Sequence, residues 1–240
     1  MTDRPVPTTP AAPEPSPEAG APATVARRAV LRLGAAAAAG GLAGACTYAG
    51  TPDPKLTALD AGRLAAVPSV DKGPVFERWV VNDPTGETPG TIVVDTPSRL
   101  LYLVLPGRKA VRYGVAVGSE AHGWSGEAVV ARKAEWPRWT PPAEMVERWP
   151  HLRPTLAAGG LPGGPDNPLG ARALYLYQNN RDTLYRIHGT NEPETIGLSV
   201  SSGCIRMRNI DVIDLYNRVP VGARVVVRPQ SAARITPVAG

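Results

Sequence analysis

Residues 91–117 contain three short apolar runs that are separated by turn residues. The runs are Thr91–Asp95, Arg99–Leu105 and Lys109–Val117, and the connections between them hold Pro, Gly and Ser. β-Branched and apolar runs of this length with such boundaries are typical of strands joined by tight turns. Short connections make consecutive strands antiparallel neighbours, so this region predicts an antiparallel sheet.

The C-terminal half predicts more strands and a short helix. Arg172–Tyr177 and Thr183–His188 alternate as paired strands do, and Ala223–Arg228 predicts a last strand. We expect a helix after Asn209, which is a plausible N-cap, and a short helix over residues 143–149. The segment from residue 118 to 161 is less regular. The chain is therefore predicted to be mostly β, a β-rich α+β fold.

Residues 187–207 hold one of the three histidines, His188, and one of the two cysteines, Cys204. A cysteine attacks as its thiolate and needs a group nearby that takes its proton, which an imidazole can do near neutral pH. Ser202 and Gly203 are small, so their backbone amides can approach the oxyanion of a tetrahedral intermediate. The pattern indicates a cysteine nucleophile with a histidine base.

A structural interpretation of the same residues stays open at this point. A lone cysteine is often a small buried hydrophobe, and a lone histidine is often a satisfied core or surface residue. Spacing in sequence also does not prove that two side chains meet.

An ordered set of motifs resembles one known family. The motifs are His188-Gly189-Thr190-Asn191, Ile196-Gly197, Ser201-Ser202-Gly203-Cys204-Ile205-Arg206-Met207 and Asn167-Pro168-Leu169-Gly170. Together with the strands from residue 91, they closely resemble the L,D-transpeptidases of the YkuD (ErfK/YbiS/YcfS/YnhG) family. The resemblance covers roughly residues 90–228, and it implies a β-sandwich of mixed sheets with one short helix after the catalytic cysteine.

The resemblance also implies a function. Cys204 would attack the diaminopimelate carbonyl of a peptidoglycan tetrapeptide stem, with His188 exchanging the proton and D-Ala leaving. The acyl group would then pass to an amine of another stem, giving a 3-3 cross-link, or of an envelope protein. Such an enzyme is a cysteine-dependent acyltransferase that needs no cofactor.

The resemblance assigns roles to further residues. Gly189 would orient His188 through its carbonyl, and the backbones of Ser202 and Gly203 would form the oxyanion hole. Arg206 would pair with a stem carboxylate or brace its loop. Thr190 and Trp139 would bind substrate, the latter from an aromatic, Pro-rich segment beside the active-site groove.

One position departs from the family pattern. The family usually has histidine where this chain has Ser202. A role played by the backbone amide would survive this change, whereas a role played by an imidazole would not.

Two other functions stay open from the sequence. An L,D-carboxypeptidase or peptidoglycan hydrolase would use the same Cys204 and His188 with water as the acceptor. A non-catalytic envelope lipoprotein that binds the wall would not need the thiol.

The N-terminal region predicts export. Residues 1–24 are rich in Pro and predict disorder. Residues 25–46 contain Arg27-Arg28, a short Ala- and Gly-rich run and an A-x-A site before Cys46, which are the parts of a twin-arginine signal. Cys46 is either the lipidated first residue of a lipoprotein or the residue after a signal-peptidase cut. We expect a protein of the periplasm or cell envelope.

The remaining boundaries follow from composition. Residues 47–89 predict a linker and flank, residues 90–228 the catalytic domain and residues 229–240 a flexible tail. The formal net charge is +5, with the basic residues scattered, so nucleic-acid binding is not expected. His122 and His151 lack metal-ligand spacing, and we predict no metal site.

Overall fold

The computed structural model describes residues 49–118, 124–201 and 203–229. The predicted disordered N-terminus, the predicted export signal with Cys46, and the chain beyond residue 229 lie outside the described residues. The helices are α1 (Ala58–Leu64), α2 (Ala143–Arg148), α3 (Arg153–Ala157) and α4 (Asn209–Arg218), with short 3-10 helices η1 (Pro150–Leu152) and η2 (Pro193–Thr195). The strands are β1 (Ala49–Gly50), β2 (Trp79–Asn82), β3 (Ile92–Asp95), β4 (Leu100–Leu105), β5 (Lys109–Gly118), β6 (Gly126–Glu135), β7 (Arg172–Gln178), β8 (Arg181–His188), β9 (Ser199–Ser201), β10 (Ile205–Met207) and β11 (Arg224–Arg228).

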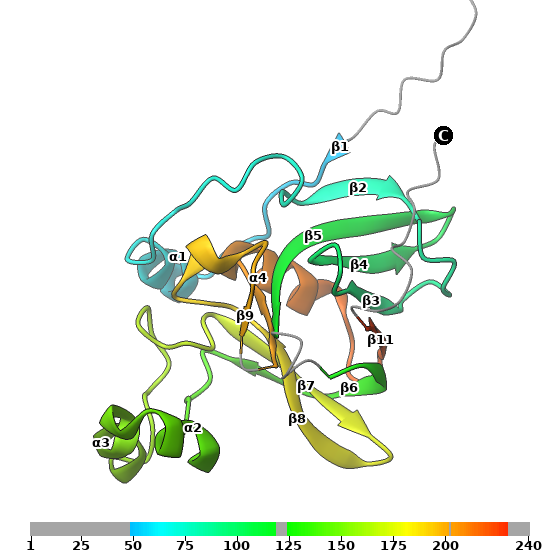
Figure 1. The fold of residues 1–240 in the computed structure, drawn as a ribbon. Helices are drawn as coiled ribbons and strands as arrows, with labels where there is room; N and C mark the ends of the chain where they lie inside the picture. The colour runs from blue at the N-terminus through cyan, green and yellow to red at the C-terminus, as the bar shows by residue number, and fades with distance from the viewer. Residues whose placement is uncertain (1–48, 119–123, 202, 230–240) are drawn as a thin grey trace, which may run out of the picture. The chain divides into compact units, whose positions relative to one another are not determined.

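The described strands form one mixed sheet that folds back on itself (Figure 1). Its order is β1-β2-β5-β10-β8-β7-β6-β11-β3-β4, and β4 also pairs with β5, which closes the path. The β10–β8, β11–β3 and β5–β9 pairs are parallel, and the others are antiparallel. The predicted β-rich fold with mixed strands and a short helix after Cys204 is confirmed.

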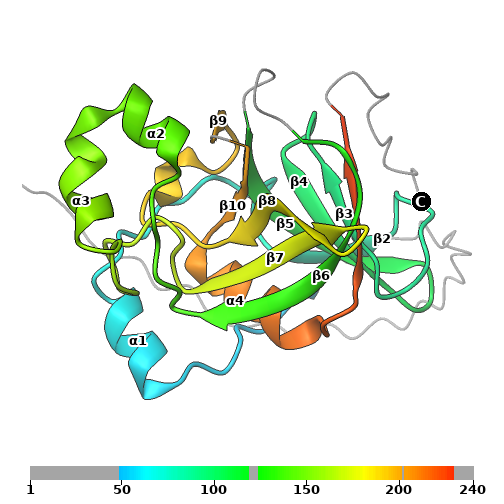
Figure 2. The same ribbon diagram turned by 90° about the horizontal axis from the view of Figure 1, so that it is seen from below.

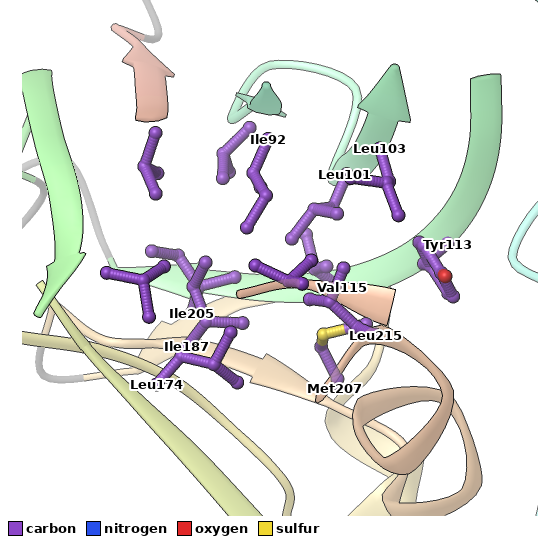
Figure 3. Close-up of a cluster of buried hydrophobic side chains, with 14 of the residues drawn as sticks. Ile92, Leu101, Leu103, Tyr113, Val115, Leu174, Ile187, Ile205, Met207 and Leu215 are labelled. Atoms are coloured by element: carbon purple, nitrogen blue, oxygen red, sulfur yellow. The ribbon is translucent and has the colours of Figure 1, made fainter. Parts of the chain in front are cut away.

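The predicted antiparallel neighbours β3, β4 and β5 are also confirmed. The inner side chains of β3 and β4 face those of β7, β8 and β10 across the main core (Figure 3). Ile92 and Leu101 lie on one side of this core, and Leu174, Ile187 and Ile205 lie on the other (Figure 3). Burying a large apolar side chain contributes about 1.5–3 kcal/mol, so this two-sided packing stabilises the fold.

Helix α4 packs against the core and carries buried acidic residues. Val212 and Leu215 join the core cluster. Asp214 accepts a hydrogen bond of 2.7 Å from the Tyr113 hydroxyl, and Asp211 is paired with Arg208 at 2.7 Å. Both buried carboxylates of α4 thus have a polar partner, which offsets the cost of burying their charge.

The predicted linker of residues 47–89 contains β2, which is a strand of the sheet, and α1, whose Leu64 packs against the cluster of Trp136, Ala171 and Ile213. β2 is hydrogen-bonded along β5, from Trp79 opposite Arg112 to Asn82 opposite Lys109. Phe76 and Val81 pack against a second apolar cluster, formed by residues of β3, β4 and β5. The segment before residue 89 therefore covers the outer face of these strands.

The segment 118–161 contains more regular structure than predicted. β6 is ten residues long and joins β7 to β11. Lys133 interrupts the alternation of apolar and polar residues in this strand. Its Nζ lies at the end of α4 and donates to the carbonyls of Tyr216 and Val219, each at 2.6 Å. A lysine at a helix C-terminus can donate hydrogen bonds to the last carbonyls, which have no partner within the helix. The predicted helix after Pro142 is confirmed as α2, and α3 was not predicted.

Candidate active site

His188 is the last residue of β8, at the point where the strand passes into a loop. Its side chain is buried, with 4% of the residue exposed. The ring Nδ1 lies 2.6 Å from the carbonyl oxygen of Gly189. Because a carbonyl can only accept, this contact favours the tautomer that carries its proton on Nδ1. In that tautomer, Nε2 is the ring nitrogen that can accept a proton.

Asn209 holds the turn that follows His188. Its Oδ1 accepts hydrogen bonds from the amides of Ala171, at 2.9 Å, and Thr190, at 3.2 Å. Its Nδ2 donates to the Thr190 carbonyl at 2.8 Å. A Cβ at Gly189 would lie 2.1 Å from this Oδ1, so the turn needs glycine there.

The prediction that Asn209 caps α4 is wrong. The N-cap is Arg208, with no capping hydrogen bond from its side chain, and Asn209 is the first residue of the helix. Its amide group is committed to the histidine loop, so it is unavailable to the helix amides. The sequence singled out the residue but not its role.

The strands β8 and β10 lie side by side and run parallel (Figure 2). Ile205 is paired with Ile187, and both side chains belong to the main core. The next pair is Arg206 with His188. Because side chains alternate along a strand, Arg206 and His188 share the face that points away from the core.

Cys204 immediately precedes β10. Continuing the register by one residue places it opposite Arg186 and on the face of His188. One strand spacing and two residues of rise separate its Cα from that of His188, which corresponds to about 8 Å. Rotation about side-chain bonds can close such a distance, so the two groups that the sequence pairs are brought to one face.

The thiol of Cys204 rests against the backbone of β8. Sγ lies 3.9 Å from the carbonyl oxygen of Leu184, which accepts from the thiol. Leu184 has φ +63°, a left-handed conformation rare for leucine. Between the Tyr177–Asp182 and Tyr175–Arg186 pairs, β8 has two residues more than β7. This bulge directs the Leu184 carbonyl toward the sulfur.

Burial raises the pKa of the Cys204 thiol, although the Arg186 amide and the charges of Arg186 and Arg206 act in the opposite direction. Burial also lowers the pKa of His188 to about 4, with the Gly189 carbonyl opposing the shift and the Arg206 charge adding to it. Both groups are therefore neutral at pH 7, and the imidazole is ready to accept a proton.

The other predicted site residues have differing environments. Gly203 has φ +120°, which favours glycine, and lies next to the thiol. Arg206 pairs with Glu192 at 2.7 Å. Thr190 is 1% exposed, and its hydroxyl accepts from the Glu192 amide at 2.9 Å. Trp139 forms a backbone bridge with Leu161.

Three residues named from the sequence lie where the structure gives no description: Ser202, His122 and Cys46. The oxyanion role expected for the backbone of Ser202 thus stays a prediction.

Asn167 holds together the Gly- and Pro-rich loop around it, a role that was not predicted from the sequence. Asn167 is fully buried, and its Nδ2 donates to the carbonyls of Pro137, Leu161 and Pro162 at 2.9–3.2 Å. Its Oδ1 accepts from the Leu169 amide at 2.8 Å. An asparagine in a Gly- and Pro-rich turn is the signal for such a role, because its short amide can bond the backbone nearby.

Two further properties concern the described residues alone. Within residues 49–118, 124–201 and 203–229, no group of three His, Cys, Asp or Glu side chains is arranged to hold a metal ion. No helix in that part of the chain has the length and apolar character to cross a membrane.

Comparison with known proteins identifies the domain. The family model YkuD, described as an L,D-transpeptidase catalytic domain, matches residues 89–227. The chain belongs to the YkuD family. The predicted resemblance is thereby confirmed, and the match includes both His188 and Cys204.

Curated relatives agree with this family. A relative named Probable L,D-transpeptidase ErfK/SrfK, from Escherichia coli (strain K12), is 38% identical over 144 residues, which are 58% of this chain and 44% of that protein. A relative named Putative L,D-transpeptidase YqjB, from Bacillus subtilis (strain 168), is 35% identical over 150 residues, which are 60% of this chain and 76% of that protein. The chain thus spans less than half of the E. coli relative.

One solved structure carries a different kind of name. It is named as a probable carnitine operon oxidoreductase from Brucella melitensis and is 51% identical. The match covers 65% of this chain and 96% of the chain of that structure. Its TM-score of 0.46 gives no basis for comparing the two arrangements. The named activity belongs to that protein.

Proposed function

We propose that this protein is a cysteine-dependent L,D-transpeptidase of peptidoglycan. The observation that supports the proposal most is that His188 ends β8 and Cys204 immediately precedes the adjacent parallel strand β10, so that both lie on the face of the sheet away from the core of a YkuD domain. A neutral buried imidazole with Nδ1 fixed by Gly189 is suited to accept the proton of a neighbouring thiol.

The first stage forms a thioester. His188 Nε2 takes the proton from Cys204, and the thiolate attacks the carbonyl of the L-centre of diaminopimelate in a tetrapeptide stem. Backbone amides near residues 202–204 bind the oxyanion of the tetrahedral intermediate. The imidazolium then protonates the departing nitrogen, the C–N bond breaks and D-Ala leaves.

The second stage transfers the acyl group. An amine attacks the thioester carbon, neutral His188 accepts a proton from that amine, and the C–S bond breaks. The new amide forms, and the imidazolium of His188 gives its proton to the Cys204 sulfur, which returns the enzyme to its starting state. An amine from a second stem gives a 3-3 cross-link, and an amine from an envelope protein anchors that protein. The bond energy of the original peptide is kept in the thioester, so no nucleotide is required.

Export is part of the proposal, because the substrate lies outside the cytoplasm. The twin arginines and the A-x-A site before Cys46 support it. Mass spectrometry of the mature N-terminus from cells tests this point. A diacylglyceryl Cys46 would establish a lipoprotein, an unmodified Cys46 would establish simple cleavage, and an intact residue 1 in all of the protein would contradict export.

The decisive experiment is incubation of the full chain with disaccharide tetrapeptides, followed by mass spectrometry of the products. The expected products are D-Ala and a cross-linked dimer, both absent from the Cys204→Ala variant. Cys46→Ala is the matched control, because it removes the other thiol of the chain. Unchanged tetrapeptide with folded protein would contradict the proposal.

The same experiment separates the alternative acceptor. Tripeptide without dimer, even when a diamine is added, would indicate an L,D-carboxypeptidase that uses water. Adducts of the added amine would indicate a transferase. A carbapenem that adds its mass to wild-type protein but not to Cys204→Ala would show that Cys204 is the acylated residue.

A further inference from the structure

A row of side chains crosses the outer face of the sheet and ends at Cys204. Arg132 on β6 is paired with Tyr175 on β7, and Tyr175 is paired with Arg186 on β8. Cys204 is opposite Arg186 when the β8–β10 register is continued. Cross-strand partners point to the same face, so the four residues form one line perpendicular to the strands.

The two arginines of this row cover one aromatic ring. The Arg132 guanidinium carbon lies 3.5 Å from the centre of the Tyr175 ring, and that of Arg186 lies 5.0 Å from it. Tyr175 is 6% exposed beneath them. Cation–π contact of this kind holds a guanidinium in place while its N–H groups still point toward solvent.

The positive charge of the row is only partly compensated. Arg186 lies 3.4 Å from Asp182, and its Nη1 also donates to the Leu184 carbonyl. Arg132 is exposed, and no ion pair involves it within the part of the chain that the structure describes. Two guanidinium groups around one ring repel each other, and an anion bound between them would relieve that repulsion.

Arg186 lies close enough to the thiol to contact the C-terminal carboxylate of a peptide whose last amide bond Cys204 attacks. In a peptide whose last amide bond is attacked, the free carboxylate follows the scissile carbonyl by one residue, or about 3.5 Å. The Cys204 thiol and Arg186 Nη1 both contact the carbonyl oxygen of Leu184, so the guanidinium of Arg186 lies beside the thiol. A carboxylate of the leaving residue would therefore reach the guanidinium of Arg186 first.

We propose that Arg132 and Arg186, held on Tyr175, form a carboxylate subsite that receives the C-terminal carboxylate of the acyl donor. The inference rests on the proposed function and adds to it the residues that recognise the leaving D-amino acid. Arginine binds carboxylates through paired N–H donors, so a donor that ends in a carboxamide would be bound less well. Arg186 makes the direct contact and Arg132 supplies the second charge.

The first test needs no turnover. In the full chain with Cys46→Ser, Cys204 is the remaining thiol, and its alkylation rates with iodoacetate and with iodoacetamide are compared. The rate ratio cancels changes in thiolate fraction, because both reagents need the same thiolate. We expect Arg186→Gln and Arg132→Gln to lower the iodoacetate-to-iodoacetamide ratio about fivefold or more. Arg132→Lys should retain part of the ratio, because the charge remains.

Arg153→Gln is the matched control, since this arginine is exposed on α3 and away from the row. Its ratio should equal that of the parent chain. Ratios in Arg186→Gln and Arg132→Gln within twofold of the parent, in variants whose circular dichroism is unchanged, would overturn the proposal.

The second test uses tetrapeptide donors that end in a carboxylate or in a carboxamide. We expect the parent enzyme to prefer the carboxylate by more than tenfold in kcat/KM, and Arg186→Gln to reduce this preference to about threefold or less. A preference that is kept in Arg186→Gln would overturn the assignment to the leaving residue. Absence of turnover with either donor would instead refute the proposed function, while the alkylation ratio still decides whether the row binds carboxylates.

Discussion

Asp60 in α1 and Arg172 at the start of β7 form a buried, two-pronged ion pair. Nη1 donates to Oδ1 and Nη2 donates to Oδ2, each at 2.9 Å, and the two side chains are 2% and 3% exposed. Trp136 also donates its Nε1–H to Asp60 at 2.9 Å. Since α1 lies outside the matched residues 89–227, the flank is joined to the catalytic domain by buried charge.

Removal of this carboxylate should destabilise the whole protein. Asp60→Asn would leave the buried Arg172 guanidinium with the longer contact to the exposed Glu135, at 3.7 Å, as its counter-charge, and breaking a buried pair in this way costs about 3–5 kcal/mol. The free energy of unfolding in urea measures the effect. Glu147→Gln, on the exposed side of α2, removes an equal charge and should change stability by less than about 0.5 kcal/mol. A loss below 1 kcal/mol in Asp60→Asn would show that the pair is unimportant.

The same pair predicts sensitivity to acid. Burial by itself raises the pKa of Asp60, but hydrogen bonds from Arg172, Thr57 and Trp136 outweigh it and hold the pKa far below its ordinary value. A depressed folded pKa stabilises the protein above the unfolded pKa, near 4, and this stabilisation is lost as the pH falls further. The stability difference between the parent and Asp60→Asn should thus be constant from pH 6 to 7 and shrink below pH 4. A difference that is independent of pH from 7 to 3 would refute this account.

The resting state of Cys204 should be a neutral thiol. Burial raises its pKa and lowers the pKa of His188 to about 4, so a thiolate–imidazolium pair is not favoured without substrate. In the Cys46→Ser chain, the rate of alkylation by iodoacetamide should rise with pH beyond 9. A plateau of reactivity between pH 5 and 8 would reveal a preformed ion pair and contradict this prediction.

Asn209 should be needed for activity because it positions the loop of His188. Asn209→Ala leaves the buried amides of Ala171 and Thr190 without their acceptor, which costs about 1–3 kcal/mol. We expect kcat/KM to fall at least tenfold, since the imidazole loses its support. Asn217→Ala, on the exposed face of the same helix, is the control and should retain activity. Equal activity of the two variants would argue against a positioning role.

Gly197 should resist substitution because Phe76 from the flank packs on it. A Cβ there would lie 2.8 Å from the phenyl ring, and the backbone has φ +88°. Gly222 has a similar φ of +92° with open space around it. Both alanine variants carry the same backbone strain, so a larger loss of stability in Gly197→Ala isolates the clash with Phe76. Equal thermal midpoints would mean that the ring moves aside freely.

The local sequence determined much of the fold. Runs such as Thr91–Asp95 and Arg99–Leu105 alternate or bury residues with the period of a strand, and their turn residues fix antiparallel neighbours. The motif around Cys204 likewise indicated the family before any coordinates. These features are local, because propensity, periodicity and short motifs depend on residues close together in the chain.

Tertiary structure decided what depends on distant partners. The sequence did not predict β6, because Lys133 interrupts its apolar pattern. The partners of that lysine, the last carbonyls of α4, are more than eighty residues away in sequence. Asn209 gave a helix-cap signal, yet its amide bonds a loop nineteen residues away in sequence. The row from Arg132 to Cys204 exists only through the registers of β6, β7, β8 and β10. Such pairings follow from packing of the whole sheet, which no short window of sequence contains.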